Sequence, residues 1–318
     1  MIEIVEYKGA LEDAWNDVVN KSRNGTFLLN RGFMDYHKER FVDCSLMFSK
    51  GNQMVGLFPA NYDESSKSIY SHQGLTYGGL ILTSSATTTD VMEMFELMKG
   101  HYKSKYGAEN IYYKPIPHIY HRYPCEEDLY CLFRNDAELV SRSISSTIFL
   151  EEALSFSTLR QRKIRRAEQE DLDVYCSDSS LNINRFWKML SETLESRHGV
   201  SPVHSASEME LLMKRFRHNI KLFLCDDDAG NLVAGVWMFV SEKVVHTQYL
   251  ASSERGREIG ALDYLIDQIL EEYSEDEGYL DFGISTENGG RSLNEGLIFQ
   301  KEGFGGRGVC YDTWKFKI

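Results

Sequence analysis

The amino-acid sequence predicts an α/β protein with mixed sheets flanked by helices, arranged as two similar units in tandem. Its 318 residues, 42% hydrophobic and 12% aromatic, suffice for two cores of roughly 150 residues each. Segments of helical periodicity alternate with β-rich runs along the chain. The order helices, hairpin, strand, helix, strand, helix, strand occurs twice. This repetition indicates two copies of one unit, over residues 1–150 and 151–318.

The first half begins with apolar residues at helical spacing over 10–41, where the turn dipeptide Asn24-Gly25 separates two expected helices. Two β-rich runs over 44–62 are divided by Lys50-Gly51-Asn52, which predicts a hairpin. A third strand over 67–73 and a glycine-rich loop over 72–80 follow. The remaining elements are a helix over 89–106, a strand over 109–117, a helix over 121–134 and a strand over 137–150.

The second half repeats this order after a basic segment at 159–167. Its hairpin over 221–240 has an Asp-Ala-Gly-Asn turn. The expected helices span 181–196, 205–217, 257–273 and 291–304, and the expected strands span 244–252, 278–284 and 309–317.

Charge and composition limit the partners. A net charge of -13 argues against DNA and wholesale nucleic-acid binding, because phosphate affinity depends on Lys and Arg. The N-terminus has acids where a signal peptide has basic residues, and no stretch approaches the roughly 20 apolar residues that span a bilayer. We therefore expect a cytoplasmic protein without membrane insertion. The six cysteines contain no Cys-x-x-Cys pair, so buried free thiols are expected.

The stretch 279–306 carries the strongest signal for a site. A short apolar strand ends here in Asp281-Phe282-Gly283 and runs through a polar turn into a helix with Asn294, Glu295 and Lys301. In open α/β sheets, ligands gather at the carboxyl edge of the strands. We therefore expect this stretch to form one wall of an active site.

Several motifs resemble those of a known family. The strand end Asp281-Phe282-Gly283-Ile284 and the downstream Lys301-Glu302-Gly303-Phe304-Gly305 resemble the D-F-x-G and F-K-x-x-F patterns of Fem-type peptidyltransferases, with Gln300 replacing the first aromatic residue. The basic segment from Thr158 to Ala167 resembles the helix that opens the second unit of those proteins. Together with the repeated element order, the chain resembles the tandem-domain, Fem-type branch of the GNAT acyltransferase superfamily.

The resemblance implies two GNAT-like domains, with donor binding in the second and the acceptor side of a cleft in the first. The donor would be an acyl-CoA, held through its phosphates at the N–H groups of a strand-to-helix turn. Leu262 stands where the family pattern has a small residue, and an ordinary solvated turn is the alternative interpretation. The residues of this cofactor turn are Arg255, Gly256, Arg257, Gly260 and Ala261.

Acyl transfer to an amine needs a base that removes the proton of the amine and a donor that stabilises the oxyanion. The resemblance implies His246 as the base and Asp281 as its nearest carboxylate. It also implies that Lys301 holds a phosphate or developing negative charge, although a surface lysine before a helix stop is the alternative.

Acceptor-binding candidates share a position at a strand end or in a neighbouring loop. Alternation along 244–252 places His246 and Gln248 on one face of the sheet and Thr247 and Tyr249 on the other. Ordinary packing and helix capping are the alternative roles. The candidates are His72, Gln73, Tyr77 and Lys114 in the first half, and Arg197, His198, His204, Gln248, Tyr249, Ser285, Arg291 and Asn294 in the second.

Five of the seven residues from 160 to 166 are basic, and Arg162, Arg165 and Arg166 lie at helical spacing. They predict either a phosphate-binding face, for CoA, a nucleotide-linked sugar or RNA, or a solvated helix. His198 and His204 lack a third ligand at a supportive spacing, so no metal is expected.

The sequence thus predicts an N-acyltransferase that moves an acyl group from a thioester donor such as acyl-CoA to the amine of a small molecule or cell-wall precursor. One alternative is an aminoacyl-tRNA-dependent, Fem-type peptidyltransferase, although residues 171–221 hold no long helical arm. The other is a catalytically inactive protein that binds ligands on a GNAT-like fold.

Overall fold

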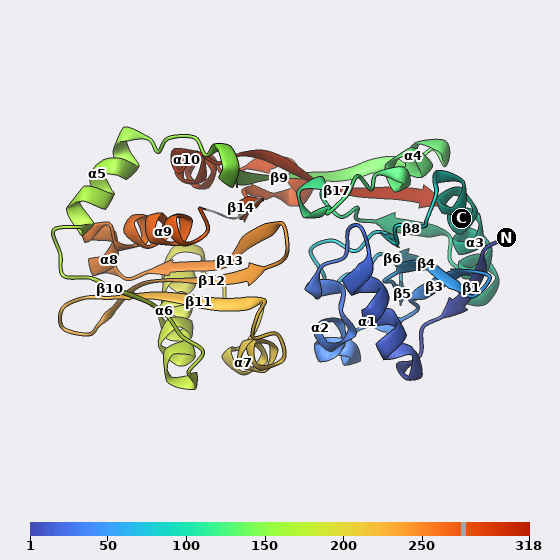
Figure 1. Cartoon of the computed structure of the whole chain (residues 1–318), viewed down its shortest axis with the longest axis horizontal. Coiled ribbons are helices and arrows are strands. Elements are labelled where there is room, and N and C mark those ends of the chain that lie inside the picture. Colours follow the sequence, from blue (N-terminus) through green and yellow to red (C-terminus); the bar gives the residue numbers. More distant parts are fainter. Residues whose placement is uncertain (275–277) are drawn as a thin grey trace. The chain divides into compact units, whose positions relative to one another are not determined.

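The computed structural model describes residues 1–274 and 278–318, which form two compact units (Figure 1). Unit 1 comprises Met1–Ile144, Thr286–Leu293 and Cys310–Ile318, and unit 2 comprises Ser145–Ser285 and Asn294–Val309. Both units are discontinuous in sequence. The strands β9 (Glu138–Phe149) and β17 (Arg307–Lys317) each run from one unit into the other. The predicted fold class, mixed sheets flanked by helices, is confirmed.

Unit 1 is built on two sheets and one long helix. In α3 (Thr88–Tyr106), buried residues recur at helical spacing from Val91 to Tyr102 and pack into the core of the unit. Thr87 and Asp90 form a capping box, and Gly107 ends the helix with φ +60°. One sheet has the order β1 (Glu3–Glu6), β3 (Leu46–Lys50), β4 (Gln53–Phe58) and β7 (Ile81–Leu82). The other continues from the end of β17 through β8 (Asn110–Tyr113), β6 (Ser68–Tyr70), β5 (Asn61–Asp63) and β2 (Val42–Asp43).

The shorter helices of unit 1 differ from the expectations. Over 10–41, α1 (Glu12–Lys21) is regular, but α2 (Arg31–Met34) continues only as a 3-10 turn with a kink at His37. The helix expected over 121–134 begins only at Glu127, as α4 (Glu127–Arg134). Pro124 explains this late start, because the residue before a proline is disfavoured in the helical region.

Unit 2 has one mixed sheet in which every pair is antiparallel except β13 with β14. Parallel neighbours need a crossover, which the helices between 253 and 273 supply. The strand order is β10 (Asp173–Cys176), β11 (Ile220–Asp226), β12 (Leu232–Val240), β13 (Val244–Ser252), β14 (Tyr279–Ile284) and the end of β9.

Helices cover both faces of this sheet (Figure 1). On one face, α8 (Glu254–Ile259) and α9 (Ala261–Glu272) bury apolar residues against Met238, Val245 and Leu280. On the other, α6 (Ser180–His198) packs Phe186 against Trp237, with ring centroids 6.3 Å apart. The remaining helices of this unit are α5 (Thr158–Ala167), α7 (Ala206–Arg215) and α10 (Glu295–Gly303).

Two helices of unit 2 deviate from the sequence predictions. A single helix was expected over 257–273, but Gly260 at φ +86° separates α8 from α9. The helix expected from 291 begins at Glu295, because 286–293 form the small hairpin of β15 (Thr286–Glu287) and β16 (Ser292–Leu293).

All six cysteines are free. Four are buried as expected, whereas Cys176 and Cys310 are exposed, so that expectation is wrong for these two. None of the helices over 1–274 and 278–318 is long and apolar enough to cross a lipid bilayer.

Candidate functional site

The sheet of unit 2 opens between its two parallel strands. The pairing of β13 with β14 covers three residue pairs and ends at His246–Asp281, although β13 continues to Ser252 and β14 to Ile284. Beyond that last pair, residues of both strands line one cavity, among them Leu250 and Phe282. A substrate in this cavity therefore has access to the point where the strands part.

A β-bulge at Gln248 changes the faces on which the side chains of β13 lie. Thr247 pairs with Met238 and Tyr249 with Trp237, so Gln248 is the extra residue. Since Met238 packs against α9 and Trp237 against α6, Thr247 and Tyr249 lie on opposite faces. The expectation that they share a face is therefore wrong, because strict alternation assumes an unbulged strand.

His246 and Asp281 form a hydrogen-bonded pair at the last rung. His246 Nδ1 lies 2.8 Å from Asp281 Oδ2, and Asp281 is fully buried. Two hydroxyl groups donate to the other carboxylate oxygen, Ser145 Oγ and Thr147 Oγ1, the latter at 2.9 Å. An acceptor at Nδ1 fixes the neutral tautomer with its proton on that nitrogen, which leaves the lone pair on Nε2 as the basic position. The structure thus brings together two residues that the sequence assigned to proton transfer.

The adjoining cavity has a volume of about 350 Å³ and is lined by α5, α6, β13, α8, α9, β14 and α10. Its charged lining residues are Arg160, Lys163, Asp263, Arg257 and Lys301. Four cations and one anion give this lining a positive balance inside an acidic protein. The cavity is therefore suited to a ligand that carries negative charge.

Lys301 belongs to α10, and its side chain reaches the end of β14. There its Nζ donates to the carbonyl oxygens of Gly283 at 2.8 Å and Ile284 at 2.9 Å. The side chain is buried, and this burial lowers the pKa of Lys301 to about 8, partly opposed by the charge of Asp281. Lys301 therefore remains largely protonated at neutral pH, with two of its three protons engaged by the backbone.

The expected donor turn is a short helix. Ser253 caps α8 by accepting from the N–H of Gly256 at 3.0 Å, and a Cβ on Gly256 would lie 2.0 Å from the carbonyl oxygen of Val233. Arg257 Nη1 donates to the carbonyl oxygen of Ser252 at 2.8 Å, and this side chain lines the cavity. The prediction of a turn between β13 and the next helix is therefore wrong in local structure. Residues 254–259 form the helix α8, which packs closely on β12 at Gly256.

Two further residues of that turn have partners outside the cavity. Arg255 forms an ion pair with Glu170 at 2.6 Å, and Ala261 is buried in the core. At Gly260, an added Cβ would lie 2.6 Å from the carbonyl oxygen of Lys163 on α5. The backbone of α5 thus covers the beginning of α9.

The cations of α5 that line the cavity are Arg160 and Lys163. Arg160 Nη1 lies 2.5 Å from Asp263 Oδ1, and Lys163 Nζ lies 3.6 Å from Asp263 Oδ2. The side chains of Arg162, Arg165 and Arg166 are exposed and do not line this cavity. Sequence reasoning missed Arg160 and Asp263. The signal for Arg160 was its spacing of four residues from the apolar Ile164, which places both on the buried face of α5.

The acceptor candidates on the loop before α7 are partly described. His204 Nδ1 lies 2.5 Å from the hydroxyl oxygen of Tyr249, on the face of the sheet that α6 covers. The side chains of Arg197 and His198 lie outside the described residues. Ser205 caps α7 in a capping box with Glu208. Within the described part of the chain, no three His, Cys, Asp or Glu side chains gather as a metal site.

The candidates of unit 1 cluster around the end of β6. His72 is buried with φ +53°, and Lys114 Nζ donates to its carbonyl oxygen at 3.0 Å and to that of Leu75. Burial lowers the pKa of His72 to about 3, helped by His37 and by Lys114, and lowers the pKa of Lys114 to about 8.

Gln73 and Tyr77 have structural partners in the same region. The side chain of Gln73 accepts from Asn61 Nδ2 at 2.7 Å, and its backbone N–H donates to Asn61 Oδ1 at 2.8 Å. Tyr77 is buried, with its hydroxyl 3.0 Å from Thr26 Oγ1. Both residues therefore contribute to the packing of unit 1.

The three remaining candidates, Asn294, Ser285 and Arg291, have different surroundings. Asn294 caps α10 by accepting from the N–H of Leu297 at 3.0 Å. Ser285 is 1% exposed, and its hydroxyl has no hydrogen-bond partner among the described residues. Arg291 belongs to unit 1 and lines a hollow with residues 139–142. Arg291 is not among the residues that line the cavity of Lys301, because the hairpin 286–293 belongs to unit 1.

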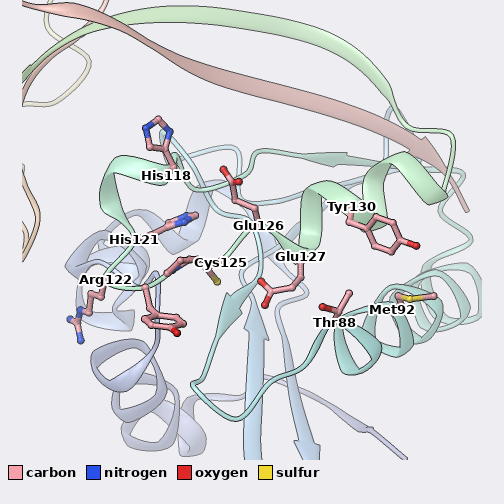
Figure 2. A pocket seen from close by; sticks show the side chains of 11 residues that line it. Thr88, Met92, His118, His121, Arg122, Cys125, Glu126, Glu127 and Tyr130 are labelled. Carbon is pink, nitrogen blue, oxygen red and sulfur yellow. The ribbon is translucent and has the colours of Figure 1, made fainter.

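A hollow of about 950 Å³ in unit 1 contains none of the expected site residues (Figure 2). Glu127 and Thr88 are among the residues that line it, and Glu127 accepts from Arg23 Nη1 at 2.8 Å. Cys125, the one thiol in its lining, is buried, which raises the pKa of this thiol to about 12. It is therefore not a thiolate nucleophile at neutral pH, and the site in unit 2 is the better candidate.

Comparison with known proteins identifies a domain family in unit 2. Residues 157–288, which lie almost entirely in unit 2, match the acetyltransferase (GNAT) domain family. Among solved structures, the chain is similar to FemX, with a TM-score of 0.72 at 12% identity over 99% of this chain and 97% of that one. It is also similar to L-PGS from Bacillus licheniformis, with a TM-score of 0.62 at 13% identity over 98% and 92% of the two chains.

A third similar structure is the C-terminal domain of a putative lysylphosphatidylglycerol synthetase from Agrobacterium fabrum, with a TM-score of 0.59 at 12% identity over 96% and 90%. No curated protein matches the sequence. The predicted resemblance to the GNAT superfamily is confirmed by the domain match over residues 157–288, and the resemblance to Fem-type proteins is confirmed in fold by the likeness to FemX.

Proposed function

We propose that this chain, which carries a GNAT domain in a fold shared with FemX, is an N-acyltransferase that moves an acyl group from an activated donor to an amine. The domain match supports a transferase of acyl or aminoacyl groups in general. The observation that carries the proposal is the His246–Asp281 pair at the point where β13 and β14 part.

The chemistry follows from that geometry. The donor occupies the cavity on the α9 face, with its carbonyl carbon at the gap between the strands. His246 Nε2 accepts a proton from the incoming ammonium group, and the neutral nitrogen attacks the carbonyl. As the tetrahedral intermediate collapses, the bond to the sulfur or oxygen of the donor breaks, and His246 returns its proton to this leaving group. The former amine nitrogen releases its second proton to solvent, which leaves a neutral amide. Asp281 holds the Nδ1 proton and stabilises the transient imidazolium.

Lys301 supplies positive charge beside the reaction centre. Its Nζ is anchored by two carbonyl oxygens, which leaves one proton for the donor. A fixed ammonium group in a buried site stabilises negative charge without reorganisation during the reaction. In the proposal, Lys301 therefore binds a phosphate of the donor or the developing oxyanion.

The acceptor amine approaches from the face of His246. On this face, the hydroxyl of Tyr249 is hydrogen-bonded to His204. The ring centroids of Tyr249 and Trp187 lie 5.4 Å apart. An aromatic wall with one polar tip suits an acceptor with an apolar body and a polar group. We propose a small molecule or a cell-wall precursor that carries a primary amine.

Two donors are compatible with the positive lining of the cavity, an acyl-CoA and an aminoacyl-tRNA. The second defines a second candidate function, a Fem-type peptidyltransferase. It is favoured by the beginning of α9, where Asp263 and the covering α5 backbone occupy the position expected for CoA phosphates.

The test is a transfer assay with the purified full chain, acetyl-CoA or mixed aminoacyl-tRNA as donor, and a panel of primary amines. We expect amide formation with one donor and a loss of at least about 100-fold in kcat for His246→Gln. Sensitivity to RNase would identify the tRNA donor. Undiminished transfer by His246→Gln would exclude this histidine as the base, and no transfer with any donor would favour an inactive binding protein.

A further inference from the structure

The beginning of α9 already holds an internal anion. Asp263 lies in the first turn of this helix, where the N–H groups and the helix dipole attract negative charge. Its carboxylate is 4% exposed and is bound by Arg160 at 2.5 Å and Lys163 at 3.6 Å. The helix end and two cations, which together would bind a phosphate, are therefore engaged by a residue of the chain itself.

A second group covers the same helix end. Gly260 precedes α9 with φ +86°, and the carbonyl oxygen of Lys163 lies 2.6 Å from the position of an added Cβ. A carbonyl oxygen is the negative end of the peptide dipole. Both protein groups at the beginning of α9, this oxygen and the carboxylate of Asp263, thus repel an incoming anion.

The cations of the cavity are unequally available. Arg257 donates to the carbonyl oxygen of Ser252, and Lys301 to those of Gly283 and Ile284, but neither is paired with a carboxylate in a described contact. Arg160 and Lys163 both contact Asp263. Arg257 and Lys301 therefore have no carboxylate partner in a described contact, whereas Arg160 and Lys163 share the carboxylate of Asp263 at the helix end.

We propose that Asp263 determines the donor specificity of the unit 2 cavity. It occupies the place of a diphosphate, so the cavity selects an acyl ester or thioester without a diphosphate near α9 and disfavours a CoA thioester. This inference rests on the proposed function for the location of the donor. Within that function, it excludes acyl-CoA as the preferred donor.

The charge of Asp263 makes the effect measurable. A carboxylate a few ångströms from a bound phosphate repels it strongly in a partly buried site. Replacement by asparagine keeps the shape and frees both cations. We expect Asp263→Asn to bind acetyl-CoA at least about tenfold more tightly than the wild-type protein, because like-charge repulsion is replaced by attraction.

The experiment measures the Kd of acetyl-CoA and of S-acetylpantetheine, which lacks the diphosphate, by titration calorimetry on the full chain. The wild-type protein should bind S-acetylpantetheine at least as tightly as acetyl-CoA. Asp263→Asn should gain affinity for acetyl-CoA only. Asp267→Asn, which removes a carboxylate one turn further along α9, is the matched control and should change neither Kd.

A wild-type preference of more than tenfold for acetyl-CoA would overturn the proposal, as would an unchanged or weaker affinity for acetyl-CoA in Asp263→Asn. The wild-type Kd values for acetyl-CoA and S-acetylpantetheine test the proposal even if Asp263→Asn does not fold after losing the ion pair with Arg160. Binding is measured without turnover. An inactive protein whose Asp263→Asn variant gains affinity for acetyl-CoA would therefore refute the proposed function and retain the role of Asp263.

Discussion

His246 Nδ1 lies 2.8 Å from Asp281 Oδ2 at the last pair of residues that joins β13 to β14. The carboxylate holds the imidazole with Nε2 as its basic nitrogen. Replacing Asp281 by Asn puts an amide in the same place, and its NH₂ group can stabilise the opposite tautomer. We expect Asp281→Asn to lower kcat at least about 100-fold with little change in KM.

Thr147→Val is the milder companion of that variant, because it removes one of the two hydroxyl donors to Asp281 and keeps the shape. Steady-state kinetics, with the donor that the transfer assay identifies, measure kcat for Asp281→Asn and Thr147→Val. We expect a kcat reduction of about tenfold for Thr147→Val, the lower end of the roughly 1.5–3 kcal/mol that one hydrogen bond to a charged group contributes, because Ser145 still donates to the same carboxylate oxygen. Equal kcat values for Asp281→Asn and the wild-type protein would show that the pair is structural.

Lys301 makes stability depend on pH in the alkaline range. Its pKa is lowered to about 8, so between pH 8 and the unfolded value near 10.5 the unfolded chain binds more protons than the folded one. Stability therefore rises as pH increases through this window. Lys301→Met should remove this rise, which amounts to up to about 3 kcal/mol. Urea unfolding at pH 7.5 and pH 10 measures it, and an identical pH dependence in both proteins would contradict the assignment.

His72 has the corresponding effect in acid. Its pKa of about 3 lies below the ordinary value of 6.5, so the unfolded chain binds the extra proton between these values. Stability should fall as pH decreases from about 6.5 toward 3, by a few kcal/mol at most. His72→Asn suits the positive φ of this position and should weaken the acid-induced loss. Thermal unfolding of both proteins at pH 4 and pH 7 tests this. If the Tm difference between the two pH values is the same in His72→Asn as in the wild-type protein, the prediction is wrong.

Gly260 is expected to be essential for the packing of α5 on α9. Alanine there would be strained at φ +86° and would place its Cβ 2.6 Å from the carbonyl oxygen of Lys163. We expect Gly260→Ala to cost at least about 1–3 kcal/mol. Gly100→Ala in α3, where a Cβ meets no atom within 4 Å, is the control and should stabilise by up to about 1 kcal/mol. Chemical denaturation measures the free energy of unfolding of both variants. Equal changes for Gly260→Ala and Gly100→Ala would refute the strain at Gly260.

Much of the fold was predictable because it depends on local patterns. The hairpins turn at Lys50-Gly51-Asn52 and near Gly230, and α3 follows from its capping and apolar spacing. These features required no knowledge of distant contacts. The pair of His246 and Asp281 was expected from the resemblance to the GNAT fold, because no local pattern joins residues 35 positions apart.

The features that were missed depend on contacts between distant parts of the chain. The bulge at Gln248 reverses the face of Tyr249, and no residue type in 244–252 marks it. Asp263 acquires its role only because α5, about 100 residues earlier, lies across the beginning of α9. Arg291 joins unit 1 because the hairpin 286–293 leaves unit 2. Local patterns contain no information about such pairings.

The discontinuity of the units has a consequence for biosynthesis. The sheet of unit 1 includes pairs between β17 and β8, such as Trp314 with Tyr113, which join the last residues of the chain to a strand made about 200 residues earlier. Domains generally fold as units during synthesis, N-terminal first. The sheet of unit 1 therefore needs residues from Cys310–Ile318, which are synthesised after every residue of unit 2. The order of translation is therefore the reverse of the order in which the two units can be finished.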